Sequence, residues 1–237
     1  MNILSILTVF DWLALAWFVI AWAAYAWYAR RVNAAGSSLL QVTNQYRKDW
    51  LLQCTSRDPR MIDSVITQTL SHTPSFFCST TILVIGGLLA MLSASDKALD
   101  LVTDIPFLAR TSSMVFGAKL ITMLVIFVYA FFRFSWSMRL YTFVALVIGG
   151  MPPPAVFASG EQEREAYATK AARLVALAAE AFNDGLRAYY FAFAVVAWLI
   201  SPIVFLFATV FVVVILYHRE FKSDVLAVLQ NDSPQIG

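Results

Sequence analysis

The chain has 237 residues, of which 60% are hydrophobic and 14% are charged, and its formal net charge is +2. Soluble domains are roughly 45–50% apolar and about 25% charged, so this composition predicts an integral membrane protein rather than a soluble domain. Because the net charge is small and the basic residues are spread over connecting segments, we expect no nucleic-acid partner.

The first predicted span covers residues 3–29 and contains a tryptophan at every fifth position from residue 12 to residue 27. Five residues advance a helix by about 140° past a full turn, so the indoles spiral around the helix. We expect Trp12 and Trp27 near the two membrane interfaces and Trp17 or Trp22 at a contact between two copies of the chain.

An all-α, integral membrane helical bundle with four transmembrane helices is predicted, as a single membrane domain over residues 1–237. The spans fall at about 3–29, 74–93, 113–135 and 188–217, and long cytoplasmic helical extensions are expected at about 37–72 and 136–187. For the stretch "RFSWSMR" (133–139), one long helix is favoured over a tight turn between two spans. Pro202 is expected to kink the last span, because proline removes a backbone donor.

The positive-inside rule orients the spans. With four spans and an outer N-terminus, twelve Lys and Arg residues fall inside and four fall outside, against ten and six for a five-span alternative. We therefore expect a multi-pass protein of the cell's inner (plasma) membrane. Its first loop lies inside and its C-terminus outside, although the basic segment "YHREFK" (217–222) fits an outer position poorly.

Two charged residues lie within predicted spans, where an unpaired charge is costly. Asp11 and Lys119 are each about seven residues from the outer end of a span, so they should reach a similar depth. The favoured interpretation is a structural intramembrane ion pair between the two helices. The alternative is a charged group that lines a pathway.

A second group of polar residues is expected at the inner mouth of the bundle. For the basic residues among them, anchoring to lipid phosphates is favoured over a dedicated anion site. The cluster comprises Arg133, Arg139, Asp184 and Arg187. Candidate pathway hydroxyls are Ser79, Thr80 and Thr81, whose alternative role is bonding back to their own helix.

Signatures of the common enzyme classes are missing from the sequence, so no enzymatic activity is expected. Cys54 and Cys78 have no metal-binding spacing. In the four-span arrangement, His72 and His218 lie on opposite sides of the membrane, which argues against a haem held by both. No cofactor and no metal site are predicted.

Three stretches carry a family resemblance: "FRFSWSMRLYTF" (132–143), "FNDGLRAYYFAFAVVAWLISP" (182–202) and "YHREF" (217–221). In these the chain resembles an uncharacterised family of multi-pass membrane proteins, the domain-of-unknown-function family number 599. The resemblance implies a multi-pass membrane fold and transfers no site residues.

Two functions remain open at this point. The first is a homo-oligomeric channel or transporter-like protein, because four spans are too few to enclose a pathway in one protomer. The alternative is an accessory or scaffold subunit of a larger membrane complex. The expected partners are membrane lipids, further copies of the chain and other membrane subunits.

Overall fold

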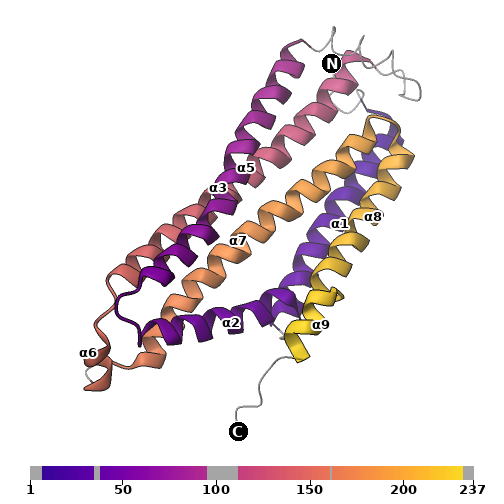
Figure 1. The fold of residues 1–237 in the computed structure, drawn as a ribbon. Coiled ribbons are helices and arrows are strands. Elements are labelled where there is room, and N and C mark those ends of the chain that lie inside the picture. The colour runs from indigo at the N-terminus through magenta and orange to yellow at the C-terminus, as the bar shows by residue number, and fades with distance from the viewer. Residues whose placement is uncertain (1–6, 35–37, 95–111, 161, 232–237) are drawn as a thin grey trace. The chain divides into compact units, whose positions relative to one another are not determined.

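The computed structural model describes residues 7–34, 38–94, 112–160 and 162–231, and within these ranges the regular secondary structure is entirely helical. The all-α prediction is therefore confirmed for the described residues (Figure 1). The helices are α1 (Val9–Ala34), α2 (Leu39–Cys54), α3 (Met61–Ser93), α5 (Ser113–Gly149), α6 (Pro154–Ala158), α7 (Arg164–Trp198), α8 (Pro202–Phe221) and α9 (Asp224–Asn231).

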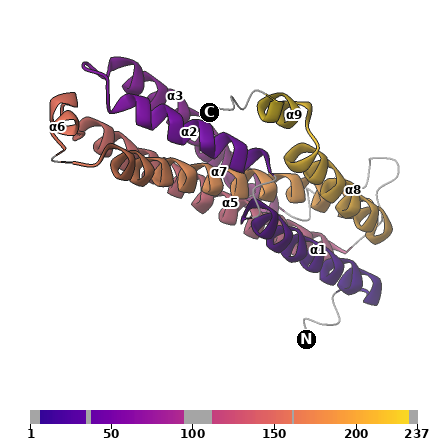
Figure 2. The same cartoon turned by 90° about the horizontal axis from the view of Figure 1, so that it is seen from below.

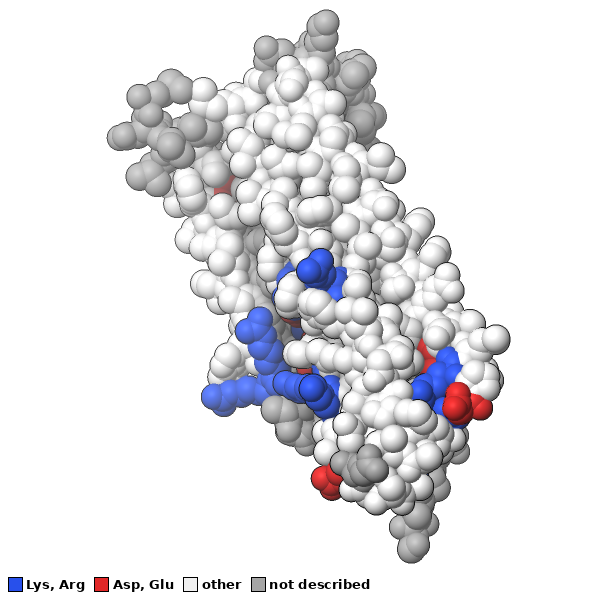
Figure 3. All heavy atoms as spheres, turned by 90° about the vertical axis from the view of Figure 1, so that its left-hand side faces the viewer, with Lys and Arg blue, Asp and Glu red and all other residues white. Residues whose placement is uncertain are grey.

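Four helical stretches are long and apolar enough to cross a membrane: Val9–Val32, Met61–Ser93, Ser113–Gly149 and Pro202–Gln230. The first three overlap the predicted spans. Helix α5 runs without interruption for 37 residues, so the long helix is confirmed and the tight turn at "RFSWSMR" is excluded. In keeping with this composition, most of the face in Figure 3 is uncharged and its Lys and Arg side chains gather in a few patches.

The predicted fourth span, 188–217, is instead divided between two helices. Helix α7 ends at Trp198 and α8 begins at Pro202, so Pro202 starts a helix and does not kink one. Proline suits the first helical position because its missing N–H would have no partner there. Ser201 caps the same end, since its Oγ accepts from the backbone N–H of Val204 at 3.1 Å.

The chain forms two compact units. Unit 1 comprises residues 1–31, 80–131 and 186–219, and unit 2 comprises residues 32–79, 132–185 and 220–237. In unit 1, α1 contributes residues 9–31, α5 residues 113–131 and α8 residues 202–219. At 1.5 Å per residue, these stretches are about 27–35 Å long. That length matches a hydrocarbon core of about 30 Å.

Ring contacts show which helices of unit 1 are parallel. The ring of Phe18 in α1 lies 5.1 Å from that of Phe205 in α8, and Tyr28 lies 6.3 Å from Tyr217, so α1 and α8 run parallel. Helix α7 runs the other way and folds back into α8 beyond residue 198, and the two views agree (Figures 1 and 2). We call the two ends of unit 1 the Trp198 end and the Tyr217 end.

This direction bears on the expected position of the C-terminus. Helices α1 and α8 both leave unit 1 at the Tyr217 end, so residues 32 onward and residues 220 onward emerge on the same side. The parallel course of α1 and α8 disagrees with the predicted C-terminus on the side opposite the first loop. The cause of this disagreement is the missed Ser-Pro start of α8, which adds one reversal of the chain.

Unit 2 has an apolar core in which alanines of α7 meet larger side chains of α2 and α5, among them Leu51, Leu140, Val144 and Ile148. Close approach of α5 and α7 depends on Gly185. A Cβ on this residue would come within 2.5–2.8 Å of ring atoms of Phe134. Helix α9 contacts α2, where the hydroxyl of Tyr46 donates to the carbonyl of Leu229 at 3.3 Å.

Candidate functional site

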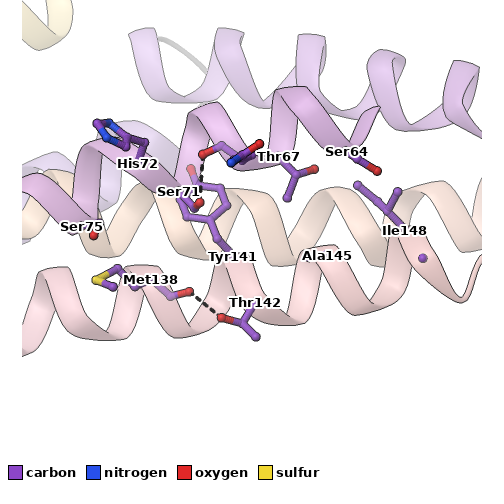
Figure 4. Close-up of a pocket in the computed structure, with 12 residues that line it drawn as sticks. Ser64, Thr67, Ser71, His72, Ser75, Met138, Tyr141, Thr142, Ala145 and Ile148 are labelled. Carbon is purple, nitrogen blue, oxygen red and sulfur yellow. Dashed lines mark hydrogen bonds between the residues drawn. The ribbon is translucent and has the colours of Figure 1, made fainter. Parts of the chain in front are cut away.

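A groove of about 570 Å³ lies between α3 and α5 in unit 2. Figure 4 shows side chains of both helices along it, with Tyr141 of α5 pointing toward α3 beside Ser71. Its volume is within the roughly 300–1,000 Å³ that small-molecule sites occupy. The residues that line it are Ser64, Thr67, Gln68, Ser71, His72 and Ser75 of α3 and Met138, Tyr141, Thr142, Ala145, Ile148 and Gly149 of α5.

The polar side of this groove comes from one face of α3. The six lining residues of α3, in "SVITQTLSHTPS" (64–75), recur at intervals of three or four positions. Residues at this spacing lie on one face of a helix. On α5, the small residues Ala145 and Gly149 leave space, and a Cβ on Gly149 would meet no atom within 4 Å. Sequence reasoning missed this site because it examined hydroxyls only in "CSTT" (78–81), although the helical spacing was a readable signal.

Several groove hydroxyls already use their protons within their own helices. Each keeps its oxygen lone pairs for a ligand, so the hydroxyls act as acceptors. The lining residues include no Asp, Glu, Lys or Arg. This chemistry suits a small uncharged molecule that donates hydrogen bonds. The internal bonds run from Ser64 to the Arg60 carbonyl, from Thr67 to that of Asp63, from Ser71 to that of Gln68 and from Thr142 to that of Met138.

The predicted intramembrane pair is built around a third residue, Trp198. Asp11 and Lys119 are buried, with 5% and 2% of their surface exposed. The Trp198 indole N–H donates to Asp11 Oδ1 at 2.8 Å, and Lys119 Nζ donates to the Trp198 carbonyl at 2.7 Å. Thr8 also donates to Asp11 Oδ2 at 2.6 Å. The structure thus brings the two charges to one site but bridges them through Trp198, in place of the direct salt bridge that was expected.

The predicted inner-mouth residues are distributed over both units. In unit 2, Arg133 forms a 2.6 Å salt bridge with Asp184, whereas Arg139 is exposed and its guanidinium lies 5.4 Å from the Phe143 ring. In unit 1, Arg187 is buried and its guanidinium lies 5.8 Å from the Tyr25 ring. The Arg133–Asp184 ion pair and the two arginine–ring contacts therefore account for all four of these side chains.

The three candidate pathway hydroxyls differ in their surroundings. Thr81 is fully buried in unit 1, and its hydroxyl lies 2.7 Å from the Tyr189 hydroxyl, with which it shares a hydrogen bond. Thr80 is half-buried in the same unit, and Ser79 is exposed in unit 2. This arrangement makes Thr81 a contact between α3 and α7.

Unit 2 also contains a buried carboxylate that sequence reasoning did not single out. Asp63 is fully buried, and its Oδ1 accepts from Arg57 at 2.6 Å and from the Trp50 indole at 2.8 Å. Nearby, burial and the negative charge of Asp63 raise the pKa of the Cys54 thiol to about 11. Arg60 donates to the carbonyls of two residues that follow α5. These bonds hold the α2–α3 connection in place.

Comparison with known protein families gives a match over most of the chain. Residues 13–225 match the family described as "Protein of unknown function, DUF599". No curated protein and no solved structure matches the chain.

Proposed function

The chain belongs to the DUF599 family, whose function is unknown, and from that premise we propose that it is a homo-oligomeric channel- or transporter-like membrane protein. In this proposal the α3–α5 groove binds a small, uncharged polar solute. The observation that carries the proposal is the polar face of α3, which turns hydroxyl, amide and imidazole groups toward open space beside α5. Such a wall offers several hydrogen-bonding groups to a polar solute.

The packing of unit 1 favours a solute pathway between copies of the chain and disfavours a pathway through a single protomer. Its interior is filled by aromatic side chains that are at most 2% exposed, namely Phe18, Phe116, Phe191, Trp198 and Phe205. A solute passing through the middle of one protomer would have to displace these rings. Large apolar side chains remain outside, including Phe207 and Phe211 of α8, at 72% and 66% exposed. Such a surface suits lipid and further copies.

The corrected chain direction supports placing the Tyr217 end of unit 1 toward the cytoplasm. Helices α1 and α8 both end there, and the chain after each of them continues into unit 2. Moving Arg219 and Lys222 to the same side changes the distribution of Lys and Arg from 12:4 to 14:2, with Lys119 as the seventeenth basic residue. The segment "YHREFK", which fitted an outer position poorly, then agrees with the positive-inside rule.

The transport proposal is tested in proteoliposomes by stopped-flow light scattering with glycerol and urea as solutes. We expect both to enter faster than into protein-free liposomes. Ala145→Phe should abolish the gain because the new ring would fill the groove. Leu146→Phe is the matched control, since Leu146 is 67% exposed and does not line the groove. Wild-type liposomes with no gain, or equal rates for both variants, would contradict the proposal.

We also propose that the groove serves binding, because its polar lining consists mainly of hydroxyl groups that can hydrogen-bond a polar solute. The alternative, an accessory subunit, is favoured by the same exposed apolar surface of α8. Mass photometry of the purified protein separates the two. A symmetric multiple of the 26.5 kDa chain supports the oligomer, whereas a single copy held by other subunits supports the accessory role.

A further inference from the structure

A second groove, of about 600 Å³, lies within unit 1 between the parallel helices α1 and α8. Its walls are mainly hydrocarbon, and its polar side chains collect toward the Tyr217 end. Trp22 plays no part in it, because that indole stacks on Phe191 at 5.2 Å inside the unit. The residues that line the groove are Trp17, Ala21, Ala24, Tyr25 and Tyr28 of α1 and Val210, Val213, Val214, Tyr217 and His218 of α8.

The length of this groove corresponds to one leaflet of a bilayer. From Trp17 to Tyr28 the lining advances eleven residues along α1, or about 16 Å. Half of a 30 Å hydrocarbon core is about 15 Å. Ala21 and Ala24 are small and leave room for a thin apolar chain along α1. A membrane helix of a second copy would be expected to contact α1 over its whole crossing, which this groove does not offer.

Basic side chains of unit 1 lie toward the polar end of the groove, although no arginine lines the groove itself. Unit 1 carries Arg30, Arg31, Arg187 and Arg219 toward this end, and His218 is exposed on the groove itself. Among the described residues of unit 1 the only carboxylate is Asp11, which lies at the Trp198 end. The nearest acid in sequence is Glu220, the first residue of the following stretch of unit 2. An anionic group would therefore be favoured at the mouth of the groove.

We propose that the α1–α8 groove is a binding site for an anionic glycerophospholipid of the leaflet at the Tyr217 end. One acyl chain lies along Ala21, Ala24 and Val214, and the phosphate lies near the hydroxyls of Tyr28 and Tyr217 and the imidazole of His218. The arginines supply the preference for a negative headgroup. Tyrosine at such a depth is well suited to this role, because its ring contacts hydrocarbon while its hydroxyl reaches the headgroup level. This site is independent of the proposed transport role.

Native mass spectrometry of the full chain in detergent tests this site, with phosphatidylglycerol and phosphatidylcholine of the same acyl chains as probes. We expect wild-type protein to retain phosphatidylglycerol about tenfold more tightly than phosphatidylcholine, a difference of about 1.4 kcal/mol in binding free energy. Ala24→Phe should remove that preference by filling the groove. Ala23→Phe is the matched control, because Ala23 is exposed on the same helix and does not line the groove.

Each outcome decides the proposal. Equal retention of the two lipids by wild type overturns it, as does unchanged phosphatidylglycerol retention in Ala24→Phe. A loss of oligomer mass in Ala24→Phe without loss of lipid would assign the groove to a second copy instead. If Ala24→Phe does not fold, Val214→Phe fills the same groove from α8, and circular dichroism with size-exclusion chromatography shows which variants are intact. The wild-type comparison of the two lipids stands without any variant.

Discussion

In unit 1 the buried charges Asp11 and Lys119 both bond to Trp198, whereas in unit 2 the buried or partly buried acids Asp63 and Asp184 bond directly to arginines. The indole N–H and the carbonyl of one residue thus serve two opposite charges at once. In a hydrocarbon surrounding, hydrogen bonds from a neutral side chain satisfy a charge without drawing a second long, flexible side chain into the interior. Unit 2, with many more charged residues, forms ion pairs between its helices.

The largest expected effect comes from breaking the polar site of unit 1. Lys119→Met removes the donor to the Trp198 carbonyl and leaves Asp11 buried without a nearby cation, so we expect a loss of about 3 kcal/mol in the free energy of unfolding. Asp11→Asn should cost less, because its amide oxygen still accepts from the indole. The measurement is unfolding in mixed micelles, followed by circular dichroism.

The double variant sharpens this test. If Trp198 couples the two charges, Asp11→Asn with Lys119→Met should lose less stability than the sum of the single variants. Trp198→Phe, which removes the indole donor and keeps the carbonyl, should abolish that coupling. Strictly additive losses would show that the two charges act independently.

The second effect concerns the closest helix contact in unit 2. Gly185→Ala places a methyl group against the Phe134 ring, and such overpacking costs about 2 kcal/mol. Phe134→Leu in the same chain should recover part of the loss by removing ring atoms. The matched control is Gly86→Ala in α3, where a Cβ would meet no atom within 4 Å. Equal unfolding midpoints for the Gly185→Ala and Gly86→Ala variants would contradict the proposed contact.

The smallest effect is a pH dependence in unit 2. Because the pKa of the Cys54 thiol is raised to about 11, its contribution to stability is fully present below the ordinary thiol pKa and is lost as the pH rises from about 9 to about 11. Between these pH values, the free energy of unfolding of the wild type should fall by about 1–2 kcal/mol more than that of Cys54→Ala. Parallel stability curves for the two proteins would rule out this contribution.

Sequence patterns predicted most of the helices, but they missed the reversal of the chain between α7 and α8. Hydrophobic runs and helical spacing identified α1, α3 and the long α5, because these signals are local. The turn before Pro202 was also a local signal, but a single apolar run of 30 residues concealed it, so the reversal between α7 and α8 was missed. Asp11 and Lys119 both bond to Trp198, a residue that lies 79 positions beyond Lys119 and whose place depends on how α7 packs.

The α3–α5 groove shows a different limit. The polar spacing on α3 was visible in the sequence, but the open space beside it depends on Ala145 and Gly149 of α5, which are distant in the sequence. A polar stripe alone does not distinguish a solvated face from a groove. The packing partner decides between them, and it is defined only in the folded structure.

The most direct test of the account is the side of the membrane on which α8 ends. In a Cys54→Ala, Cys78→Ala background, Asp224→Cys marks the chain after α8 and Ser112→Cys marks the start of α5, and both positions are exposed. An impermeant maleimide applied to spheroplasts should label Ser112→Cys at once and Asp224→Cys only after lysis. Labelling of Asp224→Cys in intact spheroplasts, with Ser112→Cys also labelled, would contradict the parallel arrangement of α1 and α8.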